Sequence, residues 1–160
     1  MMQEFDANFS ELIQEALHIA FEYTDYSGEI EVIYIYISLE LGGMYLVFYR
    51  INGHLSMHHR LNEYSSNVYD VSDNNQDWLN SSGNELAEQI RQCFIDDARE
   101  VPKYLKMIYE PLTGKFDCKI GYEPLLDLDN MVGELTVFFR WFAEEGGELE
   151  AWQKNELKKG

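Results

Sequence analysis

Two turn signals within one apolar region constrain the fold more than any other feature of the sequence. Gly42-Gly43 and Asn52-Gly53 are dipeptides that tolerate the positive φ angles of tight β-hairpins. Because strands joined by such short turns pair with opposite directions, the sequence predicts a three-stranded antiparallel meander. Its strands are the three runs with alternating side-chain character, Glu29–Glu40, Met44–Ile51 and His54–Leu61.

Four tyrosines are expected on one face of the first hairpin, opposite a face rich in isoleucine, leucine and phenylalanine. A phenol ring suits a half-exposed surface, and tyrosine is enriched in protein interfaces. These tyrosines therefore form either a binding surface or, if a helix or loop covers them, part of the core. They are Tyr34, Tyr36, Tyr45 and Tyr49.

An amphipathic helix is predicted over Asn8–Tyr23, where apolar residues recur at intervals of three and four. Asn8 and Glu11 have the spacing of a capping pair at the start of this helix. The face opposite the apolar stripe is negative, because it carries Glu11, Glu15 and Glu22.

A long polar connection is expected over residues 62–83, which are rich in Asn, Ser, Asp and Gly. Ser82 and Glu85 have capping-box spacing, so they predict the start of a second helix, which Pro102 ends.

A second hairpin is predicted from strands Tyr104–Glu110 and Lys115–Tyr122 around a Pro-Leu-Thr-Gly turn. Its latter strand alternates, and the apolar set is expected to face the core: Phe116, Cys118, Ile120 and Tyr122. A third helix is expected within residues 128–142, with a strand over Thr136–Phe139 as the alternative. A tail or short surface helix over residues 146–160 completes the chain.

This order of elements predicts a single α+β domain over residues 1–160. An antiparallel sheet of about five strands would carry the N-terminal helix and the further helices on one face. A chain of 160 residues buries roughly 70% of its unfolded surface, which is enough for one self-sufficient core.

The chain is strongly acidic, with 12 Lys and Arg against 29 Asp and Glu and a net charge of −17. This charge repels phosphates, so no direct binding to nucleic acid is expected. It is also uneven, since residues 1–49 contain nine acids and no Lys or Arg, and residues 61–90 contain six acids and again none. A one-sided negative field favours a basic protein partner, although solubility alone also accounts for an acidic composition.

Three features predict a cytoplasmic protein without membrane contact. No apolar run approaches the ~20 residues of a membrane-spanning helix. The N-terminus, Met1–Asp6, is acidic where a secretion signal is basic. The two cysteines, Cys93 and Cys118, are too few for a disulfide scaffold.

No motif of catalysis is present: the sequence lacks a nucleophile elbow, a phosphate-binding loop and a Cys/His pattern suited to zinc. On a strand, His54 and His58 would lie ~13 Å apart, too far to bind one metal ion. We therefore expect no enzymatic activity, no cofactor and no metal. One alternative stays open, a metal-dependent hydrolase that uses His54, His58 and His59 with nearby acids.

The segment Met107–Glu123, MIYEPLTGKFDCKIGYE, resembles the late hairpin of the YezG-like immunity-protein family. The similarity lies in an apolar strand, a Thr-Gly-Lys-Phe turn and a strand that closes on Tyr-Glu. The N-terminal amphipathic helix, the tyrosine-rich strand at Val32–Ile37 and Val47-Phe48-Tyr49 extend the resemblance over roughly residues 8–140.

This resemblance implies an antitoxin that neutralises the C-terminal toxin domain of a polymorphic or contact-dependent secreted bacterial protein. In several members of the family the toxin is a nuclease. Because a nuclease presents cationic groups to phosphates, carboxylates on an inhibitor would steer association and block the substrate. The partner-binding residues are expected in the stretches that lack bases: Glu63, Tyr64, Asp70, Asp73, Asp77 and Trp78 in the long connection, and Glu11, Glu15 and Glu22 on the first helix.

A second hypothesis is a non-inhibitory chaperone or adaptor for a secreted effector, with the tyrosine face as its binding surface. The identity of the toxin, the face that binds it, the mode of inhibition and the oligomeric state stay open at this point.

Overall fold

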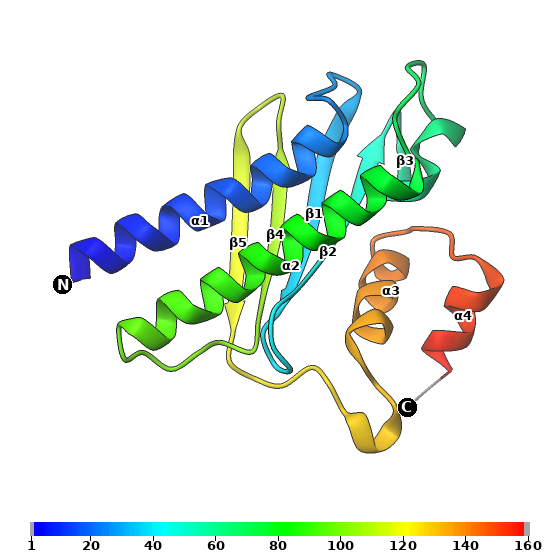
Figure 1. Ribbon diagram of the computed structural model, residues 1–160. Helices are drawn as coiled ribbons and strands as arrows, with labels where there is room; N and C mark the ends of the chain where they lie inside the picture. Colours follow the sequence, from blue (N-terminus) through cyan, green and yellow to red (C-terminus); the bar gives the residue numbers. More distant parts are fainter. Residues whose placement is uncertain (1, 159–160) are drawn as a thin grey trace.

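Five strands of residues 2–158, the part of the chain that the computed structural model describes, form one antiparallel sheet with helices on both faces (Figure 1). The strand order is β3-β2-β1-β4-β5, so β1 is central and β5 is one edge. The chain is a single α+β domain, as predicted. Its elements are α1 (Met2–Tyr23), β1 (Ile30–Ser38), β2 (Met44–Ile51), β3 (His54–Met57), η1 (His58–Glu63), α2 (Asp73–Asp96), β4 (Tyr104–Glu110), β5 (Lys115–Gly121), η2 (Leu128–Asn130), α3 (Glu134–Glu144) and α4 (Ala151–Leu157).

The hairpin between β2 and β3 confirms its sequence signal. Asn52 and Gly53 both have positive φ, at 48° and 80°, and Ile51 pairs directly with His54. This is the geometry in which a two-residue turn matches the right-handed twist of the flanking strands. The first three strands therefore form the expected meander.

The prediction that all helices share one face of the sheet is wrong. Helices α1 and α2 cover one face, and α3 packs on the opposite face with α4 beside it (Figure 1). The cause lies in β1, whose residues from Ile33 to Ser38 are all buried, so both faces of this strand need cover.

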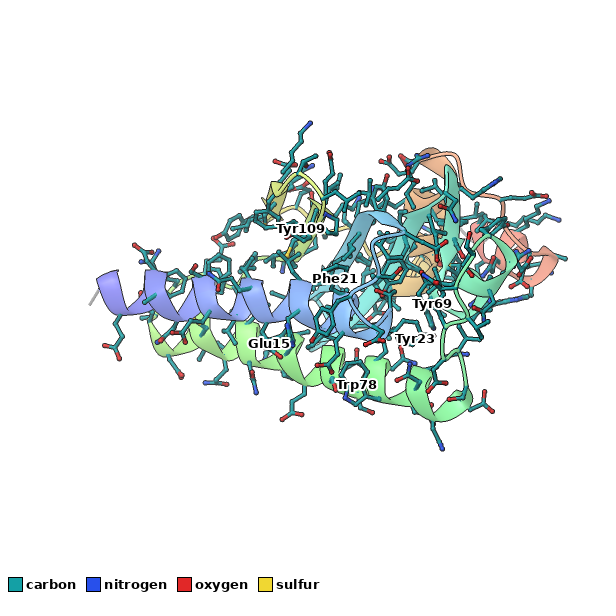
Figure 2. All side chains as sticks on the ribbon, turned by 90° about the horizontal axis from the view of Figure 1, so that it is seen from above. Glu15, Phe21, Tyr23, Tyr69, Trp78 and Tyr109 are labelled. Carbon is teal, nitrogen blue, oxygen red and sulfur yellow. The ribbon has the colours of Figure 1, made fainter. Side chains whose placement is uncertain are left out.

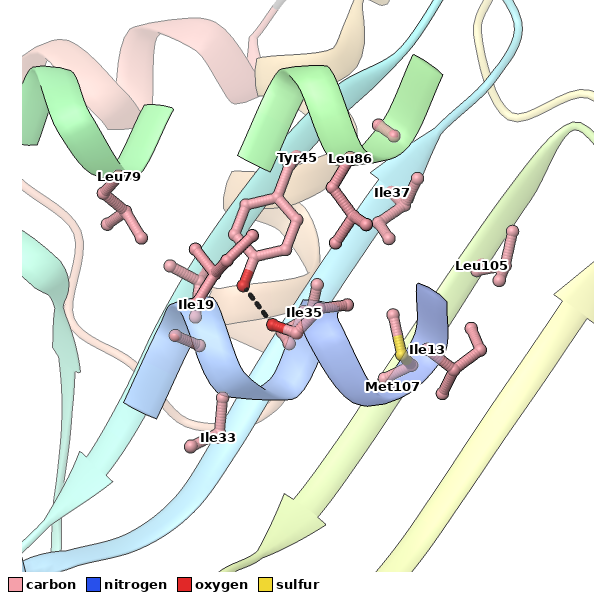
Figure 3. Packing of buried hydrophobic residues seen from close by; sticks show 14 of the residues in the cluster. Ile13, Ile19, Ile33, Ile35, Ile37, Tyr45, Leu79, Leu86, Leu105 and Met107 are labelled. Atoms are coloured by element: carbon pink, nitrogen blue, oxygen red, sulfur yellow. Dashed lines mark hydrogen bonds between the residues drawn. The ribbon is translucent and has the colours of Figure 1, made fainter. Parts of the chain in front are cut away.

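The first core lies between the sheet and the α1–α2 pair, and Figure 3 shows its centre. Ile33, Ile35 and Ile37 of β1 point into it together with the rings of Tyr45 and Tyr49 from β2. Each phenol hydroxyl donates a hydrogen bond of 2.7 Å to a backbone carbonyl oxygen of α1. Tyr45 reaches the oxygen of Ala16, and Tyr49 reaches that of Ala20. These buried hydrogen bonds fix α1 at one height and register over β2.

The second core lies on the other face and is largely aromatic. The ring of Phe48 stacks on Tyr34 at 4.4 Å and meets the edges of Trp141 and Phe142 from α3 at 5.1 and 5.0 Å. Offset and edge-to-face pairs of this kind add to the free energy of burial. They hold α3 against β1 and β2.

Two helix starts differ from the sequence prediction. Helix α1 already begins at Met2, so Asn8 lies inside the helix and does not cap it. Helix α2 begins at Asp73, where the side chain of Ser72 accepts a hydrogen bond from the Asn75 amide. The second half of the expected polar connection, residues 73–83, is therefore helical, and Ser82 lies in mid-helix.

Two later elements also differ. Strand β3 ends at Met57, and residues His58–Glu63 form a 3-10 helix in place of the second half of the predicted strand. The third helix starts at Glu134, after the short helix η2, and the tail contains α4. Lys159 and Gly160 lie outside the described residues.

Strand β5 is not buried on the predicted side. Phe116, Ile120 and Tyr122 remain 41%, 39% and 46% exposed, and Cys118 is half-buried. The strand forms the hairpin with β4 that the sequence predicts, but in the described part of the chain no further strand pairs with it. An edge position, which the alternation of side chains does not reveal, leaves this apolar set partly open to solvent.

Candidate functional site

A long groove separates the solvent-facing sides of α1 and α2, which run antiparallel across the sheet. It consists of two adjoining cavities with volumes of about 540 and 370 Å³. We call it the acidic groove. Its main lining residues are Glu4, Asn8, Glu11, Leu12, Glu15, His18 and Glu22 from α1 and Trp78, Ser82, Glu85, Gln89, Gln92, Cys93 and Asp96 from α2.

The helical repeat brings the acids of each helix to this groove. Glu11, Glu15 and Glu22 recur at intervals of four and seven, which place them on one face of α1. On α2, Glu85 and Asp96 are eleven residues apart, close to three whole turns. From Glu4 to Glu22 the rim of α1 extends about 27 Å at 1.5 Å per residue.

The electrostatic character of this helix pair is almost uniformly negative. Together α1 and α2 contain ten carboxylates and one cation, Arg91, whose guanidinium lies 3.9 Å from Glu88. Within residues 2–158, the side chains of Glu11, Glu15 and Glu85 form no ion pair or hydrogen bond. Three accessible carboxylates without internal partners are thus available to an external cation.

The floor of the groove is apolar. Ile19 and Leu86 are buried at its base, and Leu12 and Trp78 are half-buried beside them. Figure 2 shows Trp78 and Glu15 with the helix pair, whereas Tyr109 lies on the sheet side of α1. An apolar floor with a charged rim resembles the arrangement of protein interfaces, where desolvated anchors lie inside a polar ring.

A polar cluster marks the end of the groove at the C-terminus of α1. The Tyr26 hydroxyl donates to Glu22 at 3.2 Å and lies 3.0 Å from the His18 ring, and His18 is 3.3 Å from Glu22. Desolvation, together with the Glu22 carboxylate, raises the pKa of Tyr26. Glu22 is thus the groove acid with the most internal contacts.

Four of the nine predicted partner-binding residues meet at this groove. Glu11, Glu15 and Glu22 line it from α1, and Trp78 lines it from α2. The sequence placed Trp78 in a loop far from the first helix, whereas the fold sets it across the groove from Glu22.

Three predicted acids lie near the start of α2 and do not line the groove. Asp73 and Asp77 are exposed on its first turns, where a carboxylate is favoured by the helix dipole. Asp70 accepts a hydrogen bond from the Ser72 amide at 3.0 Å, and the side chain of Ser72, followed by this amide, lowers the pKa of Asp70. These three acids lie at the N-terminal end of α2 and are separate from the groove.

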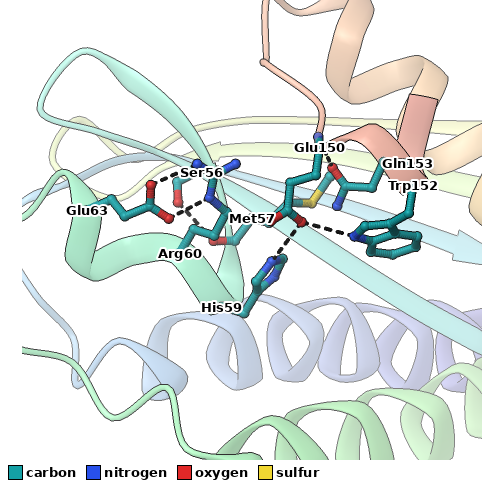
Figure 4. A network of polar contacts seen from close by, with 8 residues as sticks. All are labelled: Ser56, Met57, His59, Arg60, Glu63, Glu150, Trp152 and Gln153. Atoms are coloured by element: carbon teal, nitrogen blue, oxygen red, sulfur yellow. Dashed lines mark hydrogen bonds and ion pairs between the residues drawn. The ribbon is translucent and has the colours of Figure 1, made fainter.

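Glu63 and Tyr64 lie elsewhere, beside the β2–β3 turn. Glu63 forms a bidentate pair with Arg60 at 2.5 and 2.7 Å, seen in Figure 4, and its pKa is lowered by that contact. The Tyr64 ring stacks on His54 at 4.7 Å. Because Glu63 already has an internal cation, it is a poor candidate for binding a partner's cation.

The prediction that four tyrosines share one face is wrong. Tyr45 and Tyr49 point toward α1 and α2, and Tyr34 and Tyr36 point to the α3 side. All four are buried. The adaptor hypothesis therefore loses the surface on which it was based.

The three histidines around β3 have different surroundings, although the rings of His58 and His59 lie 5.6 Å apart. His58 is packed inside, and burial lowers its pKa to about 4. His59 lies 3.4 Å from Glu150, as Figure 4 shows, while His54 contacts Tyr64. Across residues 2–158 no group of three or more His, Cys, Asp or Glu side chains has an arrangement that could hold a metal ion.

Sequence reasoning missed about half of the groove. Glu85, Gln89, Gln92 and Asp96 line it from α2. Their spacing of three and four residues is a helical signal that lies within the helix predicted from Ser82, but nothing in it indicates that this face borders α1. The antiparallel contact of α1 with α2 has no local signal in either helix.

No protein-family model and no curated protein sequence matches this chain. Among residues 2–158, no helix combines the length and the apolar character needed to cross a membrane.

Proposed function

We propose that this protein is a non-enzymatic immunity protein that binds and neutralises a cationic toxin domain, a nuclease in the simplest case. The observation that supports the proposal is the acidic groove, in which unpaired carboxylates surround an apolar floor. In this proposal the protein acts in the cytoplasm of the cell that makes it, and the toxin domain is its physiological partner.

The physical logic follows from the chemistry of nucleases. Such an enzyme binds phosphates through Lys and Arg side chains, and these groups are equally attracted to Glu11, Glu15 and Glu85. Long-range attraction raises the association rate, and the docked groove then covers the cationic surface. Trp78 and Leu12 provide apolar contacts that slow dissociation once water is excluded.

The test uses the toxin domain encoded beside the gene for this chain. Purified chain and an inactivated toxin domain are mixed in a calorimeter, and the active pair is co-expressed in bacteria. The proposal predicts a one-to-one complex with a nanomolar or smaller Kd and rescue of growth. Binding without rescue would indicate an adaptor, and the absence of any complex would exclude the immunity function.

A further inference from the structure

The second surface of interest is the open edge of the sheet at β5, which lies on a different side of the molecule from the acidic groove. Strand β5 pairs with β4 along its whole length, from Glu110 opposite Lys115 to Tyr104 opposite Gly121, and no strand within residues 2–158 pairs with its other side. A long edge strand with unpaired peptide groups is a template for another strand, so proteins usually shield such edges.

The hydrogen-bond pattern shows which peptide groups are free. The Leu39 amide donates to the Lys103 carbonyl, so odd-numbered residues of β4 point toward β1 and even-numbered residues toward β5. Their partners in β5 are odd-numbered, which directs the even-numbered peptide groups outward. The free donors and acceptors belong to Phe116, Cys118 and Ile120.

These residues also carry the apolar side chains of the edge. Phe116 and Ile120 are about two-fifths exposed on the face that α1 covers elsewhere. Helix α1 continues past β5, and Phe9 of this projecting half stays only half-buried although it contacts Phe5 and Phe94 (Figure 1). A sixth strand paired with β5 would lie under the projecting half of α1. Its apolar side chains would then be buried together with Phe116, Ile120 and Phe9.

The opposite face of β5 carries an alternating charge pattern. Lys115, Asp117 and Lys119 are exposed, and the ammonium groups of the two lysines lie 4.0 Å from Glu110 and 3.8 Å from Glu123. Directly opposed charges on neighbouring strands attract when unlike. The complementary strand therefore reads acid, apolar, base, apolar, acid, and this pattern is the same in both chain directions.

We propose that the β5 edge is a strand-addition site that binds an extended segment of another protein with this alternating pattern. A second copy of this chain is a poor occupant. In an antiparallel β5–β5 pair its helices would cover the same face and meet the projecting ends of α1 and α2 (Figure 1). This inference is independent of the toxin assignment, because it concerns a different surface and a different kind of contact.

The test uses a fluorescein-labelled synthetic peptide, Ser-Glu-Val-Lys-Val-Glu-Ser, and its charge-swapped counterpart, Ser-Lys-Val-Glu-Val-Lys-Ser. Fluorescence anisotropy is expected to show binding of the first peptide and roughly tenfold weaker binding of the second. In hydrogen exchange, the amides of Phe116, Cys118 and Ile120 should become protected by the first peptide, while that of Asp117, already bonded to β4, should not change.

Variants of β5 distinguish binding through backbone hydrogen bonds from non-specific hydrophobic binding. Cys118→Pro removes one outward donor without removing a bond to β4, so it should abolish binding, and Cys118→Val should retain it. Thermal unfolding verifies that both variants fold. The double variant Lys115→Glu/Lys119→Glu should instead prefer the charge-swapped peptide.

Three results would overturn the proposal: no binding at millimolar protein, equal binding by folded Cys118→Pro, or protected edge amides without peptide. The last result would mean that a second copy or another part of the chain already covers β5. None of these results bears on the acidic groove, because neither peptide is a toxin.

Discussion

The ring of Tyr45 lies directly against the backbone of Gly83, so that α2 approaches β2 at a point where any larger residue would collide. A Cβ atom at Gly83 would be 2.2 Å from Cδ1 of Tyr45. The same phenol donates to the Ala16 carbonyl of α1. Tyr45 thus contacts both walls of the acidic groove from below and sets the distance between them.

Gly83→Ala is predicted to destabilise the protein despite the helix-forming tendency of alanine. The substitution gains about 1 kcal/mol of helix propensity, and overpacking a buried contact costs about 1–3 kcal/mol. We expect a net loss of up to about 2 kcal/mol in the free energy of unfolding, measured by urea denaturation. Ser81→Ala, on the exposed side of α2, is the control and should change little. A more stable Gly83→Ala variant would show that α2 does not rest on Tyr45.

Tyr45→Phe should lower the free energy of unfolding by about 1 kcal/mol, because one buried hydrogen bond is lost and the ring is kept. The matched control is Tyr122→Phe, since this exposed phenol has no hydrogen bond within residues 2–158. Equal unfolding curves for both variants would contradict the role of the Tyr45 hydroxyl in positioning α1.

Glu29 is expected to make the loop after η1 sensitive to acid. Its carboxylate accepts hydrogen bonds from Asn52, from the amides of Ser66 and Asn67 and from the Tyr69 hydroxyl. These contacts, with Asn52 the largest contributor, lower the pKa of Glu29 to about 2.

Because the folded pKa lies below the ordinary value of 4.5, this stabilisation is present above pH 4.5 and is lost as the pH falls toward 2. Urea denaturation should therefore show Glu29→Gln as less stable than the wild type at pH 7, with the two converging in acid. A stability difference that does not depend on pH would refute this account.

His58 should behave as a neutral internal residue across the physiological range. Burial lowers its pKa from 6.5 to about 4. Between these values the unfolded chain binds more protons than the folded one, so His58 makes the protein less stable as the pH falls from 6.5 to 4. An NMR titration of its ring protons should give a midpoint near 4. A midpoint at 6.5 or above would show that the ring is accessible to water.

The local signals of the sequence located the strands, apart from the end of β3, but they did not predict which faces the side chains occupy. Asn52-Gly53 forms the predicted two-residue turn, whereas β1 and β2 are joined by residues 39–43. A two-residue turn at Gly42-Gly43 would pair even with odd positions, but the observed register pairs Tyr34 with Phe48 and Ile37 with Tyr45. An odd shift in register exchanges the faces of one strand relative to the other, so the tyrosines separate.

For the helices, too, local signals did not predict which elements come into contact. The apolar stripe of α1 was visible, but the first turns of α2 contain so many polar residues that Leu79 alone is buried before Gly83. The first turns of α2 are stabilised by the Ser72 cap and by packing against β2. A local sequence pattern does not show which element a helix will pack against. From the α2 side of the acidic groove only Trp78 was predicted, because the contact between the two helices has no local signal.

The central claim, that the acidic groove docks on a cationic protein, is tested most directly by association kinetics with any toxin domain encoded beside the gene for this chain. Wild type is compared with Glu11→Gln/Glu15→Gln/Glu85→Gln and with a control of equal charge change outside the groove. That control is Glu100→Gln/Asp129→Asn/Glu148→Gln. The groove variant should associate roughly tenfold more slowly at low salt and lose most of its salt dependence, whereas the control stays close to wild type. Equal rates for the two triple variants would contradict the claim, because net charge alone would then account for the binding.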